Sequence, residues 1–408
     1  MSTQDVPAHI LAEATRQHAL LVRGVAAVYP EKGAYESDGL FDKLVQALQE
    51  DRPLKIKLGC DPTAPDIHLG HTVILNLLRR FQDLGHKVQF LIGDYTTLIG
   101  DPSGRNDTRP PLTPAEIDEY AQTYFEQVHK VLDEYPARLE ILKNSDWLSK
   151  LDFADTIKLC AQVTVAQIIQ REDFANRLAN NTPISMHELL YPIMQGYDSV
   201  CMGCDIEVGG TDQTFNCLMG RQLMQAKGMT PQVVMTMPLL VGLDGQMKMS
   251  KSKHNYVAIM DDAADMFGKI MSIPDSLLSN YFELLTDMQP DAIPEHPMAA
   301  KKQLGHTITA RFHGEAAADK AQHDFEARFS KKEVPDELPE HPLAHHAANP
   351  VKLLQEVGFA ASASEARRLI QQGSVKLDGH AVTDIHEDIA PDLPAVLQVG
   401  RRRMVRLT

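Results

Sequence analysis

Near residue 55 the chain changes from alternating polar and apolar positions to helical spacing. The segment KIKLGC, residues 55–60, alternates like a strand and ends at DPTAPD, whose two prolines break an extended run. From Leu69 the stretch LGHTVILNLLRRF places apolar residues at helical spacing, and KVQFLIG, residues 87–93, has the pattern of the next buried strand. This order predicts a β-α-β unit, and parallel sheets of this kind bind ligands beyond the carboxyl ends of their strands.

Helical patterns dominate the middle of the chain. They extend over about residues 114–143 and 154–178, and PQVVMTMPLLVGL, residues 231–243, predicts one or two later strands. Helix-like segments resume over about residues 263–330, after which prolines and charges in KKEVPDELPEHPLAHHAANP end the periodicity. A linker is therefore expected there.

The last 60 residues have a pattern of their own. A helix is predicted over residues 364–371, and Asp378 with Gly379 predicts the turn of a β-hairpin. We therefore predict an α/β protein with four parts: a Rossmann-like parallel-sheet catalytic domain at residues 1–262, an α-helical domain at 263–332, a linker at 333–349 and a small α+β domain at 350–408.

Size and composition narrow the class of protein. A chain of 408 residues is too long for one comfortable core, and 43% apolar with 23% charged residues is ordinary globular composition, which excludes a disordered or fibrous chain. The longest nearly apolar stretch, residues 233–243, is too short to cross a bilayer, and the start MSTQDVPAH lacks a secretory pattern. We expect a cytoplasmic protein with no membrane partner. Five cysteines, an odd number in a long chain, favour reduced thiols.

Charge is distributed unevenly. The net charge of −15 argues against a polyanionic partner unless a local basic surface exists. From Asn349 onward there are 8 Lys and Arg against 7 Asp and Glu, whereas the preceding residues have 32 against 48. The tail ends in GRRRMVRLT, and on charge alone a solvated face is the more common interpretation of such a cluster.

His68, Gly70 and His71 form an H-x-G-H motif at the start of the helix after the first strand. Two imidazoles near a helix N-terminus can donate hydrogen bonds to phosphate oxygens, where unpaired backbone N–H groups already favour anions. Gly70 leaves room for a flat base to approach the backbone. The alternative is a pair of ordinary surface histidines.

A second motif, KMSKS at residues 248–252, lies in a loop opened by Gly242 and Gly245. Two flexible ammonium groups beside a glycine-containing hinge can close over a triphosphate and neutralise the charge that builds up during displacement. The alternative is a solvated basic loop, which the presence of H-x-G-H in the same chain disfavours.

Together the two motifs resemble the HIGH and KMSKS signatures of class I aminoacyl-tRNA synthetases. Within that class, VGGTDQTFN (208–216), YPIMQGYDS (191–199), LIGDPSGR (98–105) and NSDWL (144–148) resemble the tyrosyl branch. Residues 362–384 resemble a small RNA-binding domain found in a ribosomal small-subunit protein and at the C-terminus of bacterial tyrosyl enzymes. The resemblance runs along nearly the whole chain, and it implies that residues 263–332 are an anticodon-arm domain and residues 350–408 an RNA-binding domain.

The resemblance also implies the roles of single residues. It assigns Asp198 to the substrate phenol, and it places five further residues in the same substrate-binding site: Tyr191, Gln195 and Asp101 around the α-ammonium, with Asn144 and Asp61. The catalytic residues it implies are His68, His71, Lys248, Lys251 and Thr63, a polar neighbour of the phosphates. The ATP-binding residues it implies are Gly70, Gly210, Asp212, Gln213, Ser250, Lys251 and Ser252. The RNA-binding residues it implies are Arg367, Arg368, Lys376, Arg401, Arg402 and Arg403.

One position departs from the better-known bacterial pattern. Lys57 stands where that pattern has a second phenol-binding tyrosine, although a lysine there resembles another bacterial branch. Two alternatives stay open on sequence alone: Asp198 and Gln195 as a surface pair one helical turn apart, and Asp101 as a turn-forming aspartate.

Cys201 and Cys204 form C-x-x-C, half of a common zinc pattern, but no second pair has ligand spacing. Buried or idle thiols are the favoured interpretation, and no dedicated metal site is expected. The Met-rich stretch MTMPLLVGLDGQMKM is more typical of core packing than of ligand binding.

The leading hypothesis is activation of L-tyrosine by ATP, with Mg²⁺ bound to the ATP, followed by transfer to tRNA(Tyr). The resemblance further implies a homodimer. One rival is a small-molecule nucleotidyltransferase, which shares the H-x-G-H turn but does not explain the tail. Another is an RNA chaperone derived from a synthetase that has lost its catalytic activity, which the intact histidines and lysines disfavour. Tryptophan is the nearest competing substrate.

Overall fold

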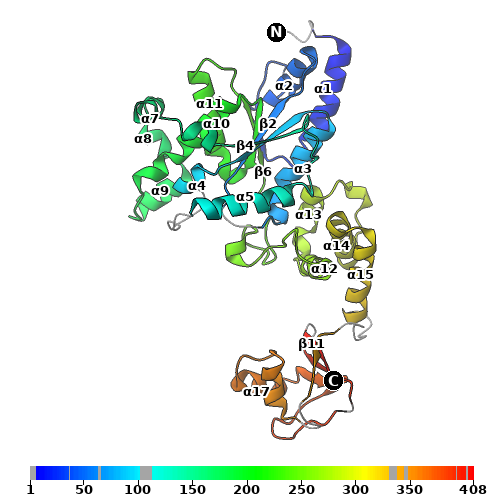
Figure 1. Ribbon diagram of the computed structural model, residues 1–408. Coiled ribbons are helices and arrows are strands. Elements are labelled where there is room, and N and C mark those ends of the chain that lie inside the picture. The colour runs from blue at the N-terminus through cyan, green and yellow to red at the C-terminus, as the bar shows by residue number, and fades with distance from the viewer. Residues whose placement is uncertain are drawn as a thin grey trace. The chain divides into compact units, whose positions relative to one another are not determined.

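The computed structural model describes residues 6–35, 37–62, 66–101, 113–329, 338–343, 348–391, 393–400 and 403–408. The chain forms two compact units, Met1–Ala318 and Asp319–Thr408 (Figure 1). Among the described residues, no helix is both long enough and apolar enough to cross a membrane.

The first unit is built on a six-stranded sheet in the order β1-β6-β5-β2-β3-β4. Strands β6, β5, β2, β3 and β4 run parallel, and β1 pairs antiparallel with β6 at one edge. The strands are β1 (Ala27–Tyr29), β2 (Lys55–Cys60), β3 (Lys87–Ile92), β4 (Leu139–Lys143), β5 (Ile206–Gly210) and β6 (Val233–Met237). All residues of β5 and β6 are buried, as expected for parallel strands covered on both faces. The predicted α/β class with a parallel sheet is confirmed.

Helices cover both faces of this sheet. Figure 1 shows α10 and α11 on one side of the strands and α1, α2 and α3 on the other. The helices up to α11 are α1 (Ala8–Leu21), α2 (Gly39–Gln49), α3 (Leu69–Asp83), α4 (Thr96–Ile99), α5 (Pro114–Val128), α6 (Ser145–Leu148), α7 (Phe153–Cys160), α8 (Val165–Ile168), α9 (Glu172–Ala179), α10 (Tyr191–Met202) and α11 (Thr214–Ala226). Because α3 connects the parallel strands β2 and β3, the predicted β-α-β unit is confirmed.

One helical prediction was wrong in part. The pattern over residues 114–143 forms helix only to Val128, and residues 139–143 are strand β4, parallel to β3. Pro136 lies between the two elements and has no N–H to continue a helical ladder. Pairing with β3 then decides the conformation of LEILK, a segment whose apolar residues are too few to distinguish the two periods.

The first unit has one continuous core that extends from the sheet into the helices that follow it. Ile56 of β2, Phe81 of α3, Met266, Phe282 and Leu304 are buried in the same hydrophobic cluster. The later helices are α12 (Ala263–Met271), α13 (Leu278–Leu285), α14 (Pro297–His313) and α15 (Glu315–Phe329). The domain limits expected from the sequence stay predictions.

The second unit begins within α15, and after this helix its described residues combine α16 and α17 with a five-stranded sheet in the order β7-β11-β10-β8-β9. Its elements are β7 (Glu340–His341), α16 (Pro350–Glu356), α17 (Ala363–Gln371), β8 (Val375–Leu377), β9 (His380–Ala381), β10 (Ala395–Val399) and β11 (Arg403–Leu407). The expected helix and hairpin are both present. Asp378 and Gly379 form the turn with φ of +48° and +83°, in the left-handed region that such turns need.

Candidate active site

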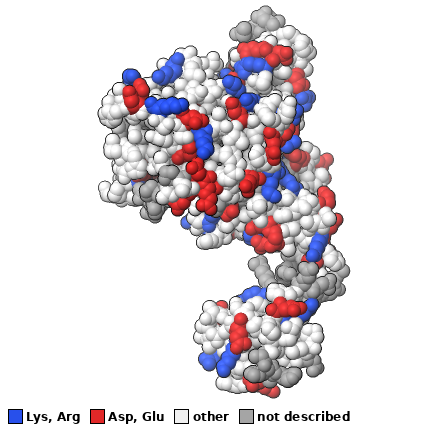
Figure 2. All heavy atoms as spheres, viewed as in Figure 1, with Lys and Arg blue, Asp and Glu red and all other residues white. Residues whose placement is uncertain are grey.

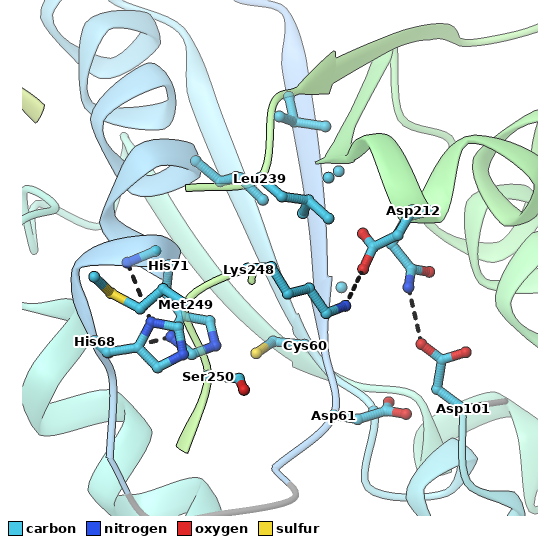
Figure 3. Close-up of a pocket in the computed structure, with 18 of the residues that line it drawn as sticks. Cys60, Asp61, His68, His71, Asp101, Asp212, Leu239, Lys248, Met249 and Ser250 are labelled. Carbon is cyan, nitrogen blue, oxygen red and sulfur yellow. Dashed lines mark hydrogen bonds and ion pairs between the residues drawn. The ribbon is translucent and has the colours of Figure 1, made fainter. Parts of the chain in front are cut away.

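A cleft of about 630 Å³ opens at the carboxyl ends of β2 and β5, beside the start of α3 (Figure 3). It brings together most of the residues singled out in the sequence: Asp61, His68, Gly70, His71, Asp101, Tyr191, Gln195, Asp198, Gly210, Asp212, Gln213, Lys248, Ser250, Lys251 and Ser252. Asn144 lies behind this lining, and Thr63 lies outside the described residues. The first crossover and the late loop, nearly 180 residues apart in the chain, therefore meet at one cavity.

The cleft has two chemically different ends. The deep end consists of Asp61, Asp101, Tyr191, Gln195 and Asp198. The loop end consists of His68, His71, Lys248, Ser250 and Lys251. Figure 3 shows His68 and His71 at the start of α3 facing the segment that carries Lys248 and Ser250.

The two histidines cap the helix that carries them. Nδ1 of His68 accepts the Gly70 N–H at 3.1 Å, and Nδ1 of His71 accepts the His68 N–H at 3.2 Å. Because each Nδ1 is an acceptor, each Nε2 bears the proton and can donate it to a ligand. The ring centroids are 3.9 Å apart.

Both imidazoles are held neutral. Burial lowers the pKa of His68 to about 2, with further contributions from His71 and Lys251. Burial and then Lys251 lower the pKa of His71 to about 4. The pair therefore offers neutral N–H donors, and positive charge at this end comes from the lysines.

The structure gives a reason for glycine at position 70 that the sequence did not show. A Cβ at this position would lie 2.9 Å from two atoms of the His68 ring. The glycine therefore allows His68 to fold back over its own helix terminus, and a side chain there would displace the imidazole that the site needs.

The loop lysines pair with acids across the cleft. Lys248 Nζ lies 2.9 Å from Asp212 Oδ2, and Lys251 Nζ lies 3.7 Å from Asp66 Oδ2. The Lys248 side chain is 44% exposed. The Lys248–Asp212 pair is accessible to solvent, so an incoming ligand can exchange it at modest cost, whereas the Lys251 ammonium itself is buried.

Asn255 anchors this loop, and sequence reasoning missed it. Its Oδ1 accepts the Ser250 N–H at 2.8 Å, and its Nδ2 donates to Asp244 Oδ2 at 2.8 Å and to the Lys248 carbonyl at 3.2 Å. A Cβ at Gly242 would collide with the same amide. No local motif marks such an asparagine, because its partners lie 5 to 11 residues earlier, before and within the KMSKS segment.

Asp198 is buried at the deep end, so the surface-pair interpretation was wrong for it. Only 2% of the residue is exposed, because α10 packs its face against the sheet and α11. Trp147 Nε1 donates to Oδ1 at 2.8 Å and Asn144 Nδ2 donates to Oδ2 at 3.3 Å. Burial raises the pKa of Asp198 to about 7, although the Lys57 charge and the two donors oppose the shift.

A second carboxyl, that of the half-buried Asp61, lies close by. Tyr191 Oη and Thr96 Oγ1 each donate to it at 2.8 Å. Burial and then the nearby Asp101 charge raise its pKa to about 7. Gly93 makes room for it, because a Cβ there would lie 2.0 Å from Asp61 Oδ1.

Asp101 and Gln195 complete the deep end. Gln213 Nε2 donates to Asp101 Oδ2 at 2.8 Å, and Arg171 Nη2 lies 3.7 Å from Asp101 Oδ1. These long-range partners distinguish Asp101 from an aspartate that only forms a local turn. Within the part of the chain that the structure describes, Gln195 Oε1 is a buried acceptor with no hydrogen-bond partner. Three carboxyls and a free amide oxygen in one pocket favour a ligand with a positive charge and N–H donors.

The residues proposed for RNA lie in the second unit. Arg367 and Arg368 on α17 and Lys376 on β8 are exposed, whereas Arg401 and Arg402 lie outside the described residues. Arg403 donates to the Phe359 carbonyl and its guanidinium lies 5.8 Å from the ring of that residue. On the visible face, Figure 2 shows basic and acidic side chains interspersed over both units.

The cysteines show no sign of cross-linking. Cys201 is exposed and Cys204 is buried, and both are free thiols. Burial raises the pKa of Cys204 to about 12. Over the described residues, no group of three or more His, Cys, Asp or Glu side chains is placed to hold a metal ion.

Comparison with known proteins gives two family matches. A family model described as tRNA synthetases class I (W and Y) matches residues 49–330, and one described as S4 domain matches residues 351–392. The tyrosine–tRNA ligase 2 of Vibrio vulnificus (strain YJ016) is 50% identical over 400 residues, covering 96% of this chain and 98% of that protein. The tyrosine–tRNA ligase of Geobacter sulfurreducens is 49% identical over 404 residues, with coverage of 96% and 98%.

Solved structures show a similar fold at lower identity. A C-terminally truncated mitochondrial tyrosyl-tRNA synthetase of Aspergillus nidulans is 20% identical, with a TM-score of 0.63 over 79% of this chain and 98% of that one. The tyrosyl-tRNA synthetase of Archaeoglobus fulgidus, complexed with L-tyrosine, is 21% identical, with a TM-score of 0.59 over 76% and 99%. These similarities support the fold.

Proposed function

The chain belongs to the class I tRNA synthetases of the tryptophan and tyrosine group, among the tyrosine–tRNA ligases, and we propose how its cleft divides the reaction between its two ends. The observation that carries the proposal is the meeting of His71 and Lys251 with Asp198 around one cavity. The end proposed to bind phosphates and the end suited to an amino acid then open into the same cavity, so the two substrates can meet there.

The first step joins the amino acid to the nucleotide. The carboxylate of L-tyrosine attacks the α-phosphorus of ATP in line, a P–O bond forms, and the bond to the leaving pyrophosphate breaks. No general base is needed, because the attacking carboxylate is already ionised. In the second step a hydroxyl of the 3′-terminal adenosine of tRNA(Tyr) attacks the acyl carbon and AMP leaves.

The loop end stabilises the charge that develops on the phosphates. Nε2–H donors of His68 and His71 and the ammonium groups of Lys248 and Lys251 face the same space, and such donors lower the barrier when they bind the transition state more strongly than the ground state. Thr63 is assigned beside them by resemblance alone. Ser250 and Ser252 belong to the same loop as further ATP contacts.

We assign binding of the ATP ribose to Asp212, with Gln213 beside it. The nucleotide is proposed to lie against the backbone at Gly70 and Gly210. In the free enzyme Asp212 pairs with Lys248. When ribose hydroxyls occupy Asp212, Lys248 is released toward the phosphates. Nucleotide binding and loop closure are thereby coupled through one acid.

Mg²⁺ is expected to arrive on the ATP phosphates. When bound it neutralises charge on the departing pyrophosphate. The lysines and histidines at the loop end fit a phosphate-bound cation of this kind, since they are donors and leave its coordination to phosphate oxygens.

The deep end recognises tyrosine. Asp198, with Asn144 and Trp147 fixing its two oxygens, accepts the phenol hydroxyl. The α-ammonium is placed among the acidic and amide groups described above, which are Asp61, Asp101, Tyr191 and Gln195. With a phenylalanine ring in place of the phenol, Asp198 would lose one hydrogen-bond donor and keep those of Asn144 and Trp147, and a buried carboxylate with a lone pair left unused is costly.

The second unit is proposed to bind tRNA through Arg367, Arg368, Lys376 and the tail arginines, with residues 263–332 contacting the anticodon arm. A small domain with local basic groups supplies the positive surface that the acidic remainder of the chain lacks.

A homodimer is also proposed. Large apolar side chains are exposed on α7, α8, α9 and the neighbouring turn: Phe153, Ile157, Val165, Leu178 and Met186. Such a concentration is typical of a surface that a second protein covers.

The test is ATP–pyrophosphate exchange with each amino acid supplied separately. We expect L-tyrosine to support exchange and tryptophan to fail. Exchange with no amino acid, or only with a different small acid, would favour a nucleotidyltransferase, and no exchange at all would favour an RNA-binding protein without catalysis. A chain ending at residue 349 should keep exchange and lose most aminoacylation of tRNA(Tyr); loss of both would make the second unit structural.

A further inference from the structure

Lys57 uses all its donor capacity inside the protein. The residue is 0% exposed, and its ammonium donates to the Gln195 carbonyl at 3.1 Å, to Ser199 Oγ at 2.7 Å and to Glu207 Oε1 at 2.8 Å. An ammonium has three N–H donors, so none is left for a substrate hydroxyl. Lys57 is also absent from the cleft lining, whereas Asp198 belongs to it.

Glu207, the partner acid, borders the cleft, but its carboxylate is committed to partners inside the protein. Its Oε2 accepts from Ser199 Oγ at 3.2 Å and from Gln232 Nε2, and only 1% of the residue is exposed. Gln232 is fixed in turn by the Cys204 thiol, which donates to its Oε1 at 2.8 Å. A buried charge with this many partners holds one geometry, because any rearrangement would leave an unpaired ion.

The contacts of Lys57 bracket the residue that faces the substrate. Gln195 and Ser199 are one helical turn apart on α10, and Asp198 lies between them. Lys57 reaches both from β2, and Glu207 extends the connection to β5. The turn of α10 that carries Asp198 is therefore tied to the two central strands by a single ammonium group.

We propose that Lys57 is a positioning residue for tyrosine recognition, which anchors the Asp198 turn and balances the charge of Glu207 without touching the substrate. It follows that Asp198 alone among these groups meets the phenol hydroxyl. The inference rests on the proposed tyrosine–tRNA ligase function and adds how this chain recognises the hydroxyl with a lysine at position 57.

The charges around Asp198 make the idea measurable. Burial raises its pKa to about 7, Lys57 lowers it, and Glu207 raises it. The Lys57 ammonium stays charged, because Glu207 and Asp198 outweigh the burial that lowers its pKa. The other titratable groups that act on or near Asp198 are Asp61 after β2 and Tyr191 and Cys201 on α10.

The experiment compares Lys57→Met with Glu207→Gln in the full chain. The readout is the acid limb of kcat/KM for tyrosine in ATP–pyrophosphate exchange, which reports ionisation in the free enzyme. Removing the positive charge should move the limb to higher pH, and removing the negative charge should move it to lower pH, each by about one unit. Asp61, which titrates in the same range, responds chiefly to burial and Asp101, so these substitutions leave its contribution in place.

The double variant Lys57→Met with Glu207→Gln removes both charges together, so it leaves no unpaired buried ion and can be measured if a single variant does not fold. It should move the limb upward by less than Lys57→Met alone, because Lys57 acts on Asp198 more strongly than Glu207 does. Lys55→Met, an exposed lysine two residues earlier on the same strand, is the matched control and should leave the profile unchanged.

The outcomes separate cleanly. Opposite shifts, with a raised KM for tyrosine and an unchanged KM for ATP, support the inference. Shifts in the same direction, no shift, or an equal rise in both KM values overturn it and leave Lys57 a packing residue. A wild-type chain without tyrosine-dependent exchange refutes the proposed function instead.

Discussion

The two ends of the cleft handle charge in opposite ways. At the deep end the charged groups are buried and locked: Lys57 is 0% exposed and Asp198 2%, and each has fixed partners from different elements. At the loop end 44% of the Lys248 side chain is exposed, and 23% of the Lys251 side chain, although the Lys251 ammonium itself is buried. The proposed function thus assigns specificity to a buried interior and catalysis to a more exposed loop.

The difference follows from what each end must do. Discrimination of a single hydroxyl needs an acceptor whose alternatives are costly, and burial supplies that cost. Stabilising a transient polyanion needs cations that can rearrange as charge moves, and exposed ion pairs exchange partners at little cost. Substitutions at the deep end should therefore affect selectivity, whereas those at the loop end should affect rate.

The largest expected effect comes from Asp198→Asn. The change keeps the shape of the side chain but removes the charge and one acceptor, so kcat/KM for tyrosine should fall roughly 100- to 1,000-fold, as for other buried charged hydrogen bonds. The measurement is exchange with tyrosine and phenylalanine in parallel, and the preference for tyrosine should narrow. Asp146→Asn, an exposed acid in the same neighbourhood, is the control; equal selectivity in both variants would mean that Asp198 does not recognise the hydroxyl.

A smaller effect, on rate alone, is expected for Lys251→Ala. Loss of one cation that stabilises the transition state should lower the single-turnover rate of adenylate formation by about 100-fold, with the KM for tyrosine changed by less than about threefold. Lys227→Ala, an exposed lysine at the end of α11, should behave like the wild type. A rise in tyrosine KM as large as the loss of rate would remove the division between the two ends.

The smallest effect concerns the charge of the histidines. His71→Asn should slow adenylate formation by the same factor at pH 6 and pH 8, within about twofold, because burial and Lys251 lower the pKa of His71 to about 4 and keep it neutral over that range. A factor that shrank steadily as pH rose through 6.5 would show that the cation is the active form.

The same shift predicts the direction of a stability change. The pKa of His71 in the folded chain, about 4, lies below the usual value of about 6.5. Between pH 4 and pH 6.5 the unfolded chain therefore binds a proton at His71 that the folded chain does not bind. His71 therefore destabilises the fold progressively as pH falls from about 6.5 toward 4. In urea unfolding, this loss should be smaller in His71→Asn than in the wild type.

Much of the framework could be predicted because it is local. The strand at residues 55–60 and the helix from Leu69 follow from periodicities that span only one element. Strand β4 was missed because LEILK gains its conformation from pairing with β3, and β11 was missed because its two arginines, Arg403 and Arg406, obscured a short alternation. The motifs identified most of the cleft lining, but they offered no sign of Asn255 or Gly93.

The sequence by itself determined the class of protein and the two motifs that meet at the cleft, and it predicted the acid proposed to meet the phenol, because these depend on residue types at short spacings. Only the tertiary structure decided which groups Lys57 contacts, that Asp198 is buried, and that both histidines are neutral donors. Those properties arise from desolvation and from partners on other elements, and neither is encoded in the neighbours of a residue along the chain.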